Sequence, residues 1–378
     1  MNILIGADIV PTNSNMGEFE KGSVRDIVGV ELLNLLSSVD YRVFNLEVPL
    51  VDVQRPIKKC GPNLIASTKS VQGIKALGVD FLTLANNHIL DQGPEGIKST
   101  ERVLKEQGIS YAGVGSTQQA AATPYIFEKE GVKIGIYCCA EHEFSIVSPQ
   151  QPGANPFDPL ESLDHVRELK KIVDYVIVLY HGGKEHYRYP SPYLQKVCRK
   201  IVESGADFVV CQHSHCIGCE EKWNGGTIVY GQGNFLFDDS ESEFWQTSLL
   251  IQLCFENGAV SVRYIPIEKN GNGVKLASDA SRKRIMDDFH LRSAEIQTPS
   301  FVADQYAEFA EMFINNYIRS GVPFGQSIIA RILNKLSKNT FFVNCVSDSG
   351  KLALINYMEC EAHRELYLQG IRNHLKNK

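Results

Sequence analysis

The stretch Asn2-Ile-Leu-Ile-Gly-Ala-Asp8 decides the fold, because a short apolar run ends there on a carboxylate. A run of this length is typical of a buried strand. Similar apolar runs begin at Tyr41, Phe81, Tyr175 and Phe208. In open α/β sheets, ligands bind beyond the carboxyl ends of the strands. The five runs therefore predict strands that deliver their terminal residues to one site.

Each of these runs is followed by residues that can bind a metal or move a proton. In chain order they are Asp8, Glu47, Asn87 with His88, His181, and His213 with His215. The last pair is the most specific, since alternate residues at a strand end face the same side. A single donor could equally be a cap or loop residue, but agreement among five strand ends indicates a metal centre.

The donor types suit hydrolysis of a phosphoester. That reaction needs a strong nucleophile and neutralisation of charge on the phosphoryl oxygens, and one or two divalent ions can supply both. Carboxylates, an amide oxygen and imidazoles are ligands for Mn, Zn, Fe or Mg. The metal ligands predicted here are Asp8, Glu47, Asn87, His181, His213 and His215. His88 is then free to contact the substrate and protonate the leaving group.

Length and composition restrict the class of protein. The 378 residues suit one large domain with a smaller one, and 43% hydrophobic residues are ordinary for a globular protein. A net charge of −6 argues against a nucleic-acid partner, which requires a basic face. No apolar run is long enough to span a membrane. Met1 directly precedes the first strand, and the ten cysteines fit reduced thiols, so we expect a cytoplasmic protein.

Strands alternate with amphipathic segments such as Val24 to Leu36, which predict helices, up to about Phe237. This order predicts an α/β fold with helices on the sheet faces. Gln246 to Phe255 and Ala259 to Ile267 flank an Asn-Gly turn signal and predict an antiparallel hairpin. A turn-rich break at 269–273 then precedes a helical tail, whose last helix is predicted from about Leu352 to the C-terminus. We expect a domain over 1–270 and a helical subdomain over 279–378. The tail could serve as a lid, a specificity element or a homodimer surface.

Cysteines near the histidine pair offer a competing metal site. Cys216 and Cys219 have the spacing of zinc ligands, but the sequence has no second Cys-x-x-Cys pair. A four-coordinate zinc site would therefore also need the nearby histidines as ligands. A thioredoxin-type pair would open a helix after a strand. The glycine-rich stretches match neither a Walker loop nor a dinucleotide fingerprint.

The ordered motifs resemble the CapA family of bacterial capsule or poly-γ-glutamate biosynthesis proteins, whose domain is similar to calcineurin-like metallophosphoesterases. The resemblance covers roughly Ile3 to Ile267. It rests on Gly6-Ala7-Asp8, Asn45-Leu46-Glu47, Ala85-Asn86-Asn87-His88, His181-Gly182-Gly183-Lys184-Glu185, Gly205-Ala206-Asp207, Gln212-His213-Ser214-His215 and Tyr230-Gly231-Gln232-Gly233-Asn234-Phe235. It implies a metallophosphoesterase-like β-sandwich flanked by helices, with a C-terminal helical extension.

The resemblance also implies individual roles. Glu47 stands at the position of the bridging carboxylate. One site would use Asn87, His181 and His213 in addition, and the other would use Asp8 and His215. Glu47, His88 and His181 are the catalytic candidates, with His88 as the acid. Phosphoesterases begin with Asp-x-His, whereas Val10 follows Asp8 here, so the resemblance leaves open one ion or two. Gln212 replaces the usual glycine and could crowd the loop.

Charged residues near the motifs predict contacts to an anionic small molecule or polymer precursor. Arginine can bind phosphate or carboxylate with two hydrogen bonds. The substrate-contact candidates are Lys58, Lys59, Lys184, Glu185, Arg188 and Asn234, with Tyr187 and Glu141-His142-Glu143 as a further rim. A solvated charged loop is the alternative for each.

The leading hypothesis is a phosphoesterase that acts on an anionic intermediate of capsule or exopolymer synthesis. A second hypothesis is that the protein has this fold but no catalytic activity, and acts as an accessory subunit of a synthesis complex. A third is metal-dependent hydrolysis of an amide or γ-glutamyl bond, which the same chemistry permits.

Overall fold

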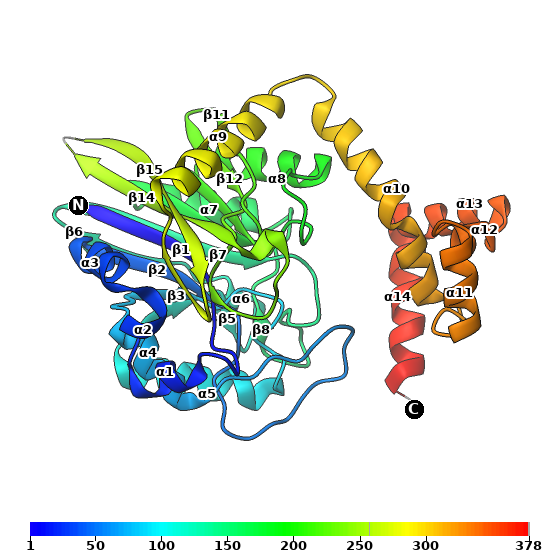
Figure 1. Ribbon diagram of the computed structural model, residues 1–378, viewed down its shortest axis with the longest axis horizontal. Coiled ribbons are helices and arrows are strands. Elements are labelled where there is room, and N and C mark those ends of the chain that lie inside the picture. The colour runs from blue at the N-terminus through cyan, green and yellow to red at the C-terminus, as the bar shows by residue number, and fades with distance from the viewer. Residues whose placement is uncertain (257, 377–378) are drawn as a thin grey trace. The chain divides into compact units, whose positions relative to one another are not determined.

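A computed structural model describes residues 1–256 and 258–376. The chain forms two compact units, Met1–Val302 and Ala303–Lys378. The first unit contains two main sheets that pack face to face, with helices on their outer faces (Figure 1). This arrangement is the helix-flanked β-sandwich predicted from the sequence.

The first sheet is mixed and contains the N-terminal strands. Its order is β16-β15-β14-β1-β2-β3-β4, and β13 pairs in parallel with the end of β1. The bounds are β1 Asn2–Val10, β2 Tyr41–Leu46, β3 Phe81–Thr83, β4 Ser110–Ala112, β13 Asn234–Phe237, β14 Thr247–Glu256, β15 Ala259–Asn270 and β16 Gly273–Leu276.

The second sheet has the order β11-β12-β10-β9-β7-β6, and a small β5-β8 pair lies apart from both sheets. Parallel pairing joins β7, β9, β10 and β12. The bounds are β5 Val114–Gly115, β6 Tyr125–Lys129, β7 Val132–Ala140, β8 Gly153–Ala154, β9 Tyr175–His181, β10 Phe208–Gln212, β11 Glu220–Trp223 and β12 Gly226–Tyr230.

Helices cover the outer face of each sheet in the first unit. α1–α5 pack on the first sheet, and α7 and α8 pack on the second. The bounds are α1 Met16–Lys21, α2 Arg25–Val28, α3 Val30–Ser38, α4 Val71–Ala76, α5 Gly93–Gln107, α6 Gln118–Ala121, α7 Ser162–Lys170, α8 Pro192–Glu203 and α9 Asp279–Glu295, with 3-10 turns η1 Thr68–Ser70 and η2 Glu243–Trp245.

Side-chain alternation along β1 explains the layers. Ile3 and Ile5 face the core between the two sheets, whereas Leu4 faces the helices. Because both faces of the strand are buried, the run is apolar throughout, as the sequence suggested. The central strands of both sheets can therefore place polar groups only at their ends.

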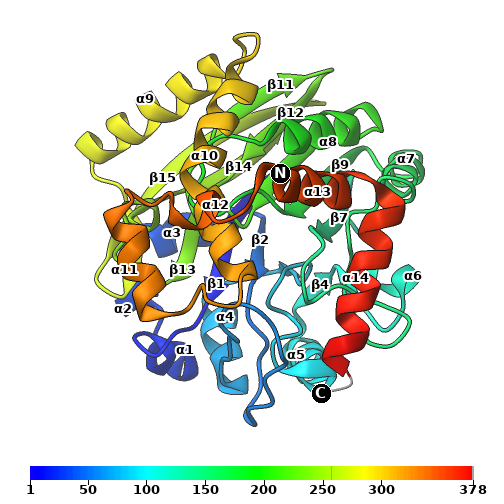
Figure 2. The ribbon, with the colours of Figure 1, turned by 90° about the vertical axis from the view of Figure 1, so that its right-hand side faces the viewer.

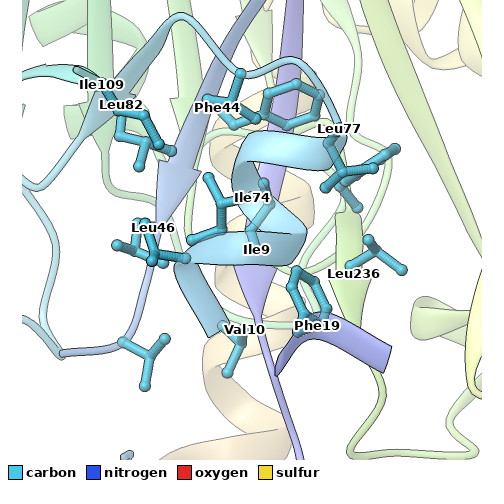
Figure 3. Close-up of a cluster of buried hydrophobic side chains, with 14 of the residues drawn as sticks. Ile9, Val10, Phe19, Phe44, Leu46, Ile74, Leu77, Leu82, Ile109 and Leu236 are labelled. Atoms are coloured by element: carbon cyan, nitrogen blue, oxygen red, sulfur yellow. The ribbon is translucent and has the colours of Figure 1, made fainter. Parts of the chain in front are cut away.

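Val10 lies at the end of β1 and is 2% exposed. Its side chain belongs to the core under the helices, in the same cluster as Phe19, Ile74 and Leu236 (Figure 3). The register between β1 and β13 shifts between Asp8 and Ile9. The position that carries a histidine in phosphoesterases is therefore part of the hydrophobic core.

The C-terminal part of the first unit differs in detail from the sequence prediction. The hairpin exists as β14 and β15, paired antiparallel, although Asn257 itself lies outside the described residues. The break predicted at 269–273 is the turn between β15 and β16 of the same sheet. α9 contacts β11 and β15 and lies in the first unit (Figure 2), whereas the sequence pattern groups residues 279–295 with the helical tail.

Two predicted helices are each divided. The segment 24–36 forms α2 and α3 because Gly29 adopts a φ of 74°. The segment from 352 onward forms α13 and α14, with Cys360 extended between them. Both interruptions are local departures from a helical pattern that is otherwise correct.

The second unit is helical and has a small core. Asn315 donates to Asn334 and accepts from the backbone of Phe342, which joins three helices. No described helix is long and apolar enough to cross a membrane. The bounds are α10 Phe301–Gly321, α11 Ile328–Leu336, α12 Phe341–Asn344, α13 Asp348–Glu359 and α14 Glu361–Lys376.

Candidate metal centre

The predicted donors meet where the two sheets face each other at the carboxyl ends of their strands. The first sheet delivers Asp8 from β1 and Glu47 from the residue after β2. The second delivers His181 as the last residue of β9, and His213 from the residue after β10. These donors converge, as the strand-end argument predicted, because contacts join residues of one sheet to residues of the other.

Glu47, His213 and His215 form the centre of the site. One donor atom from each residue lies within 4.8 Å of the other two, and all three side chains are buried. Both carboxylate oxygens of Glu47 and Oδ2 of Asp8 are buried without a hydrogen-bond partner. A buried anionic oxygen that lacks a partner is costly, and a cation removes that cost. The residues therefore fit a divalent metal ion.

His181 extends this centre toward the loop after β3. Its Nε2 lies 3.2 Å from Oε1 of Glu47 and 3.0 Å from Oδ1 of Asn87. Burial, followed by the proximity of His213, holds the pKa of His181 well below its usual range. The ring is therefore neutral, which is the form that binds metals.

His213 is linked to the rim through Glu143. Nε2 of His213 lies 3.3 Å from Oε1 of Glu143, while Oε2 of Glu143 accepts from Asn87 Nδ2 at 3.3 Å. The hydrogen bond from His213 lowers the pKa of Glu143 to about 2. Within the rim stretch 141–143, Glu143 is thus the residue in direct contact with two predicted ligands.

His215 completes the centre from the other side. Its Nδ1 lies 2.8 Å from Oδ1 of Asn234 and 3.5 Å from Oδ2 of Asp8. Burial opposes a charged ring here, but the carboxylates of Glu47 and Asp8 outweigh it and raise the pKa of His215 to about 9. Trp245 packs on the ring at a centroid distance of 5.1 Å.

The backbone of the histidine loop is unusual. His213 has a φ of 98° and His215 a φ of 51°. Left-handed conformations in residues other than glycine cost about 1–3 kcal/mol and cluster at functional sites. The loop therefore stores strain in a conformation that turns both rings toward Glu47.

Buried amides hold the carboxylates in place, and we did not predict them. Nδ2 of Asn45 donates to Oδ1 of Asp8 at 2.8 Å, and Asn86 donates to Oδ1 of Asn45 at 3.0 Å. Asn45 lies two residues before Glu47, so strand alternation could have placed it on the same face. This chain of hydrogen bonds fixes β1, β2 and the loop after β3 relative to one another.

His88 belongs to a second group beside the centre. Its Nδ1 lies 2.6 Å from Oδ2 of Asp91, and the other oxygen of Asp91 forms an ion pair with Lys59. Asp91 is fully buried, and the Lys59 side chain is 3% exposed. Nζ of Lys59 lies 3.2 Å from the same Nδ1, so Asp91 and Lys59 both hold this ring nitrogen and Nε2 is left for other chemistry. The spacing His88-x-x-Asp91 was a signal in the sequence that we did not use.

The predicted substrate contacts fall into distinct environments. Lys58 is exposed, whereas Lys59 is held by Asp91. Lys184 pairs with Glu185 at 3.2 Å, and Arg188 pairs with Glu243 at 2.9 Å. Asn234 orients His215, so its contact in this structure is with a predicted ligand.

The structure shows the environment of Gln212 and of the cysteine pair near the histidines. Gln212 Nε2 donates to the carbonyl oxygen of Gly6 at 3.2 Å and to Gln232 at 3.3 Å, so it joins β1 to the neighbouring loop. Cys216 and Cys219 are buried but do not join the cluster found among the described residues. Burial raises the pKa of Cys216 to about 11, which disfavours the thiolate that zinc requires.

Comparison with known proteins agrees with these motifs. The family described as bacterial capsule synthesis protein PGA_cap matches residues 5–239, which is more than half of the chain. The chain belongs to the PGA_cap family. The resemblance to CapA proteins noted from the sequence is thereby confirmed.

Named relatives of this PGA_cap chain include two from Bacillus. The capsule biosynthesis protein CapA of Bacillus anthracis is 28% identical over 260 residues, covering 66% of this chain and 63% of the relative. The PGA biosynthesis protein CapA of Bacillus subtilis (strain 168) is 29% identical over 234 residues, covering 61% of each. The chain thus spans less than two thirds of the length of either relative.

Solved structures with a similar arrangement are more distant. A novel phosphatase from Mycoplasma pneumoniae gives a TM-score of 0.47 at 13% identity, covering 71% of this chain and 94% of that one. A 5'-nucleotidase precursor from Thermus thermophilus gives 0.40 at 13% identity, covering 76% and 58%. Neither likeness indicates a substrate for the PGA_cap chain.

Proposed function

We propose that this PGA_cap chain is a metal-dependent hydrolase, a phosphoesterase that acts on an anionic intermediate of capsule or exopolymer synthesis. The observation that carries the proposal is the buried group of Glu47, His213 and His215, with carboxylate oxygens that lack hydrogen-bond partners. Two imidazoles and a carboxylate are a donor set used by catalytic divalent ions.

Six residues of the chain would surround the metal ion in this proposal. Glu47, His213 and His215 hold the cation, and Asp8, Asn87 and His181 complete its surroundings. A bound divalent ion supplies an activated water and neutralises negative charge on the substrate.

His88 would transfer the proton. Asp91 holds its Nδ1, so Nε2 can deliver a proton to the leaving oxygen. Lys59 forms an ion pair with the buried Asp91 and lies 3.2 Å from Nδ1 of His88. In this proposal Lys59 positions His88 both directly and through Asp91, and it need not touch the substrate.

Two observations support an anionic substrate. The family and the named relatives are described by capsule or PGA synthesis, and this supports a substrate that is a polymer precursor. Lys184 and Arg188 follow His181 closely in sequence, and the Lys184 side chain is 33% exposed. We therefore retain Lys58, Lys184, Glu185 and Arg188 as candidate contacts.

The test begins with metal content. The purified protein is treated with chelator, reloaded with Mn²⁺, Zn²⁺, Fe²⁺ or Mg²⁺, and analysed by elemental mass spectrometry. Phosphomonoesters, phosphodiesters and γ-glutamyl peptides are then screened with each loaded form. We expect turnover of a phosphoester, and we expect His213→Ala to lose both metal and activity.

The matched control is His290→Ala, which removes an exposed histidine of α9 and should change neither property. Turnover of γ-glutamyl peptides but not phosphoesters would establish amide hydrolysis by the same centre. If no substrate is turned over and His213→Ala retains its metal, the enzymatic proposal is wrong and an accessory role in a synthesis complex replaces it.

Two further proposals concern organisation. We propose that the catalytic unit extends through α9 to Val302, because that helix packs on β11 and β15. We also keep a cytoplasmic location as a proposal, supported by ten cysteines that are all free thiols.

A further inference from the structure

A cavity beside η2 is lined by Glu243 and by none of the predicted metal ligands. Its volume is about 400 Å³, within the range of small-ligand sites. Three arginines line it: Arg188 after β9, and Arg284 and Arg292 on α9. Because 284, 288 and 292 are spaced by four residues, the arginines and Asp288 occupy the same face of the helix.

Two of the three arginines, Arg188 and Arg292, are fixed by hydrogen bonds. Arg188 donates to the Ile217 carbonyl oxygen and to Glu243, and its guanidinium lies 4.8 Å from the centre of the Phe244 ring. Arg292 donates through Nε to the Gly218 carbonyl oxygen at 2.8 Å. These contacts fix the two guanidinium groups while leaving donor groups of Arg292 without an acceptor among the described residues.

The charges around the cavity do not balance. Three arginines face two carboxylates, and Glu243 is already paired with Arg188. Asp288 remains as the carboxylate opposite Arg284 and Arg292, and Arg284 forms no ion pair or side-chain hydrogen bond with the described residues. Burial and then the nearby Arg188 lower the pKa of Arg292, so the two guanidinium groups repel each other. A bound anion would relieve that repulsion.

Residues that line this cavity are sequence neighbours of residues at the metal centre. Trp245 packs on His215 at a centroid distance of 5.1 Å, while its neighbour Gln246 lines the cavity. Ile217, also on the cavity wall, lies two residues after His215. An extended molecule that reaches the metal centre could therefore continue over η2 into the arginine cavity.

We propose that the cavity formed by Arg188, Arg284 and Arg292 is an anion-binding subsite that holds a second phosphate or carboxylate group of the substrate. The binding of an anion rests on the cavity alone. Its role as a substrate subsite rests on the proposed hydrolase function. The proposal restricts the substrate to molecules with a second anionic group beyond the reacting bond.

Binding is tested on the full chain freed of metal, so that the metal centre does not contribute. Inorganic pyrophosphate and tricarballylate are titrated separately by calorimetry, to distinguish a preference for phosphate from one for carboxylate. We expect at least one of them to bind. Arg292→Gln and Arg284→Gln should each weaken binding about 10-fold or more. Asp288→Asn should strengthen it, because a competing carboxylate is removed.

The control is Arg282→Gln, which lies on the same helix, pairs with Asp279 and is 53% exposed. It should bind the probes like the unmodified chain. The proposal is overturned if neither probe binds at about 10 mM, a concentration above the millimolar Kd of a weak complex. It is also overturned if Arg284→Gln and Arg292→Gln both bind like the control. Arg284 is exposed, so its replacement keeps the test valid even if Arg292→Gln does not fold.

The substrate role is tested separately with the metal-loaded protein and any substrate found in the screen. Arg284→Gln should raise KM for substrates with a second anionic group more than it lowers kcat, and leave KM for simple monoesters as it was. Anion binding without any turnover would contradict the hydrolase function and leave the anion site standing. Turnover without anion binding would support the hydrolase function and contradict the anion site.

Discussion

Replacement of Glu47 by glutamine should abolish most of the stabilisation that a divalent ion gives. Glu47 contributes the carboxylate of the three-residue group, and both of its oxygens are buried without hydrogen-bond partners. Glutamine keeps the size of the side chain but removes its charge. Loss of a supporting contact alone reduces metal affinity about 10–100-fold, so loss of this ligand should cost about 100-fold or more.

The magnitude can be stated for thermal unfolding. At a metal concentration 100 times Kd, the unmodified chain gains about 2.7 kcal/mol, whereas a variant with 100-fold weaker binding gains about 0.4 kcal/mol. At about 2 °C per kcal/mol, the expected rise in Tm is about 5 °C against less than about 1 °C.

The assay is calorimetric unfolding of chelator-treated protein, repeated after addition of Mn²⁺ or Zn²⁺. Glu106→Gln is the matched control, since this residue is exposed on α5 and pairs only with Arg102 among the described residues. The control should show the full metal-dependent shift. If Glu47→Gln shows it as well, the ion does not bind at Glu47 and the assignment of the centre fails.

The same geometry predicts the outcome of four other experiments. His88→Ala should lower kcat about 100-fold while bound metal, measured by mass spectrometry, stays constant; loss of metal would contradict a proton-transfer role. The raised pKa of His215 adds about 3 kcal/mol to the stability of the metal-free protein. This contribution is fully present below pH 6.5 and is lost as the pH rises to about 9. Urea unfolding at the two pH values measures it, and equal stabilities would refute it. Val10→His should lower stability by about 1–3 kcal/mol without adding a metal equivalent, since the position is in the core; a second equivalent by mass spectrometry would show otherwise. A fragment of residues 1–302 should keep the metal-dependent rise in Tm, and its loss would mean that the second unit contributes to the centre.

The sequence was sufficient to predict the five strands that carry the donor residues and the convergence of those residues. Asp8, Glu47, His181 and the two loop histidines come together because buried strands are apolar on both faces and release polar residues only at their termini. That rule is local, so it can be applied without knowing which strands are neighbours.

Other features depend on contacts between distant parts of the chain. Asp91 was not predicted as a site residue because its role depends on contacts to His88 and Lys59, and these contacts depend on the conformation of a loop. The arginine cavity joins Arg188 to α9, about one hundred residues away along the chain, and no periodic pattern indicates that packing. The environment of Val10 likewise depends on a register shift next to Asp8, which side-chain alternation alone does not predict.

The donors of the metal centre are divided between two sheets, and this division has a consequence for the rate of unfolding. Glu47 extends from one sheet, whereas His213 and His215 extend from the loop after β10 of the other. A bound ion would join the sheets at one edge, so that they could separate only after at least one ligand had dissociated. Metal would then slow unfolding itself, and a protease would digest the chelated protein faster even at temperatures where both forms are almost fully folded.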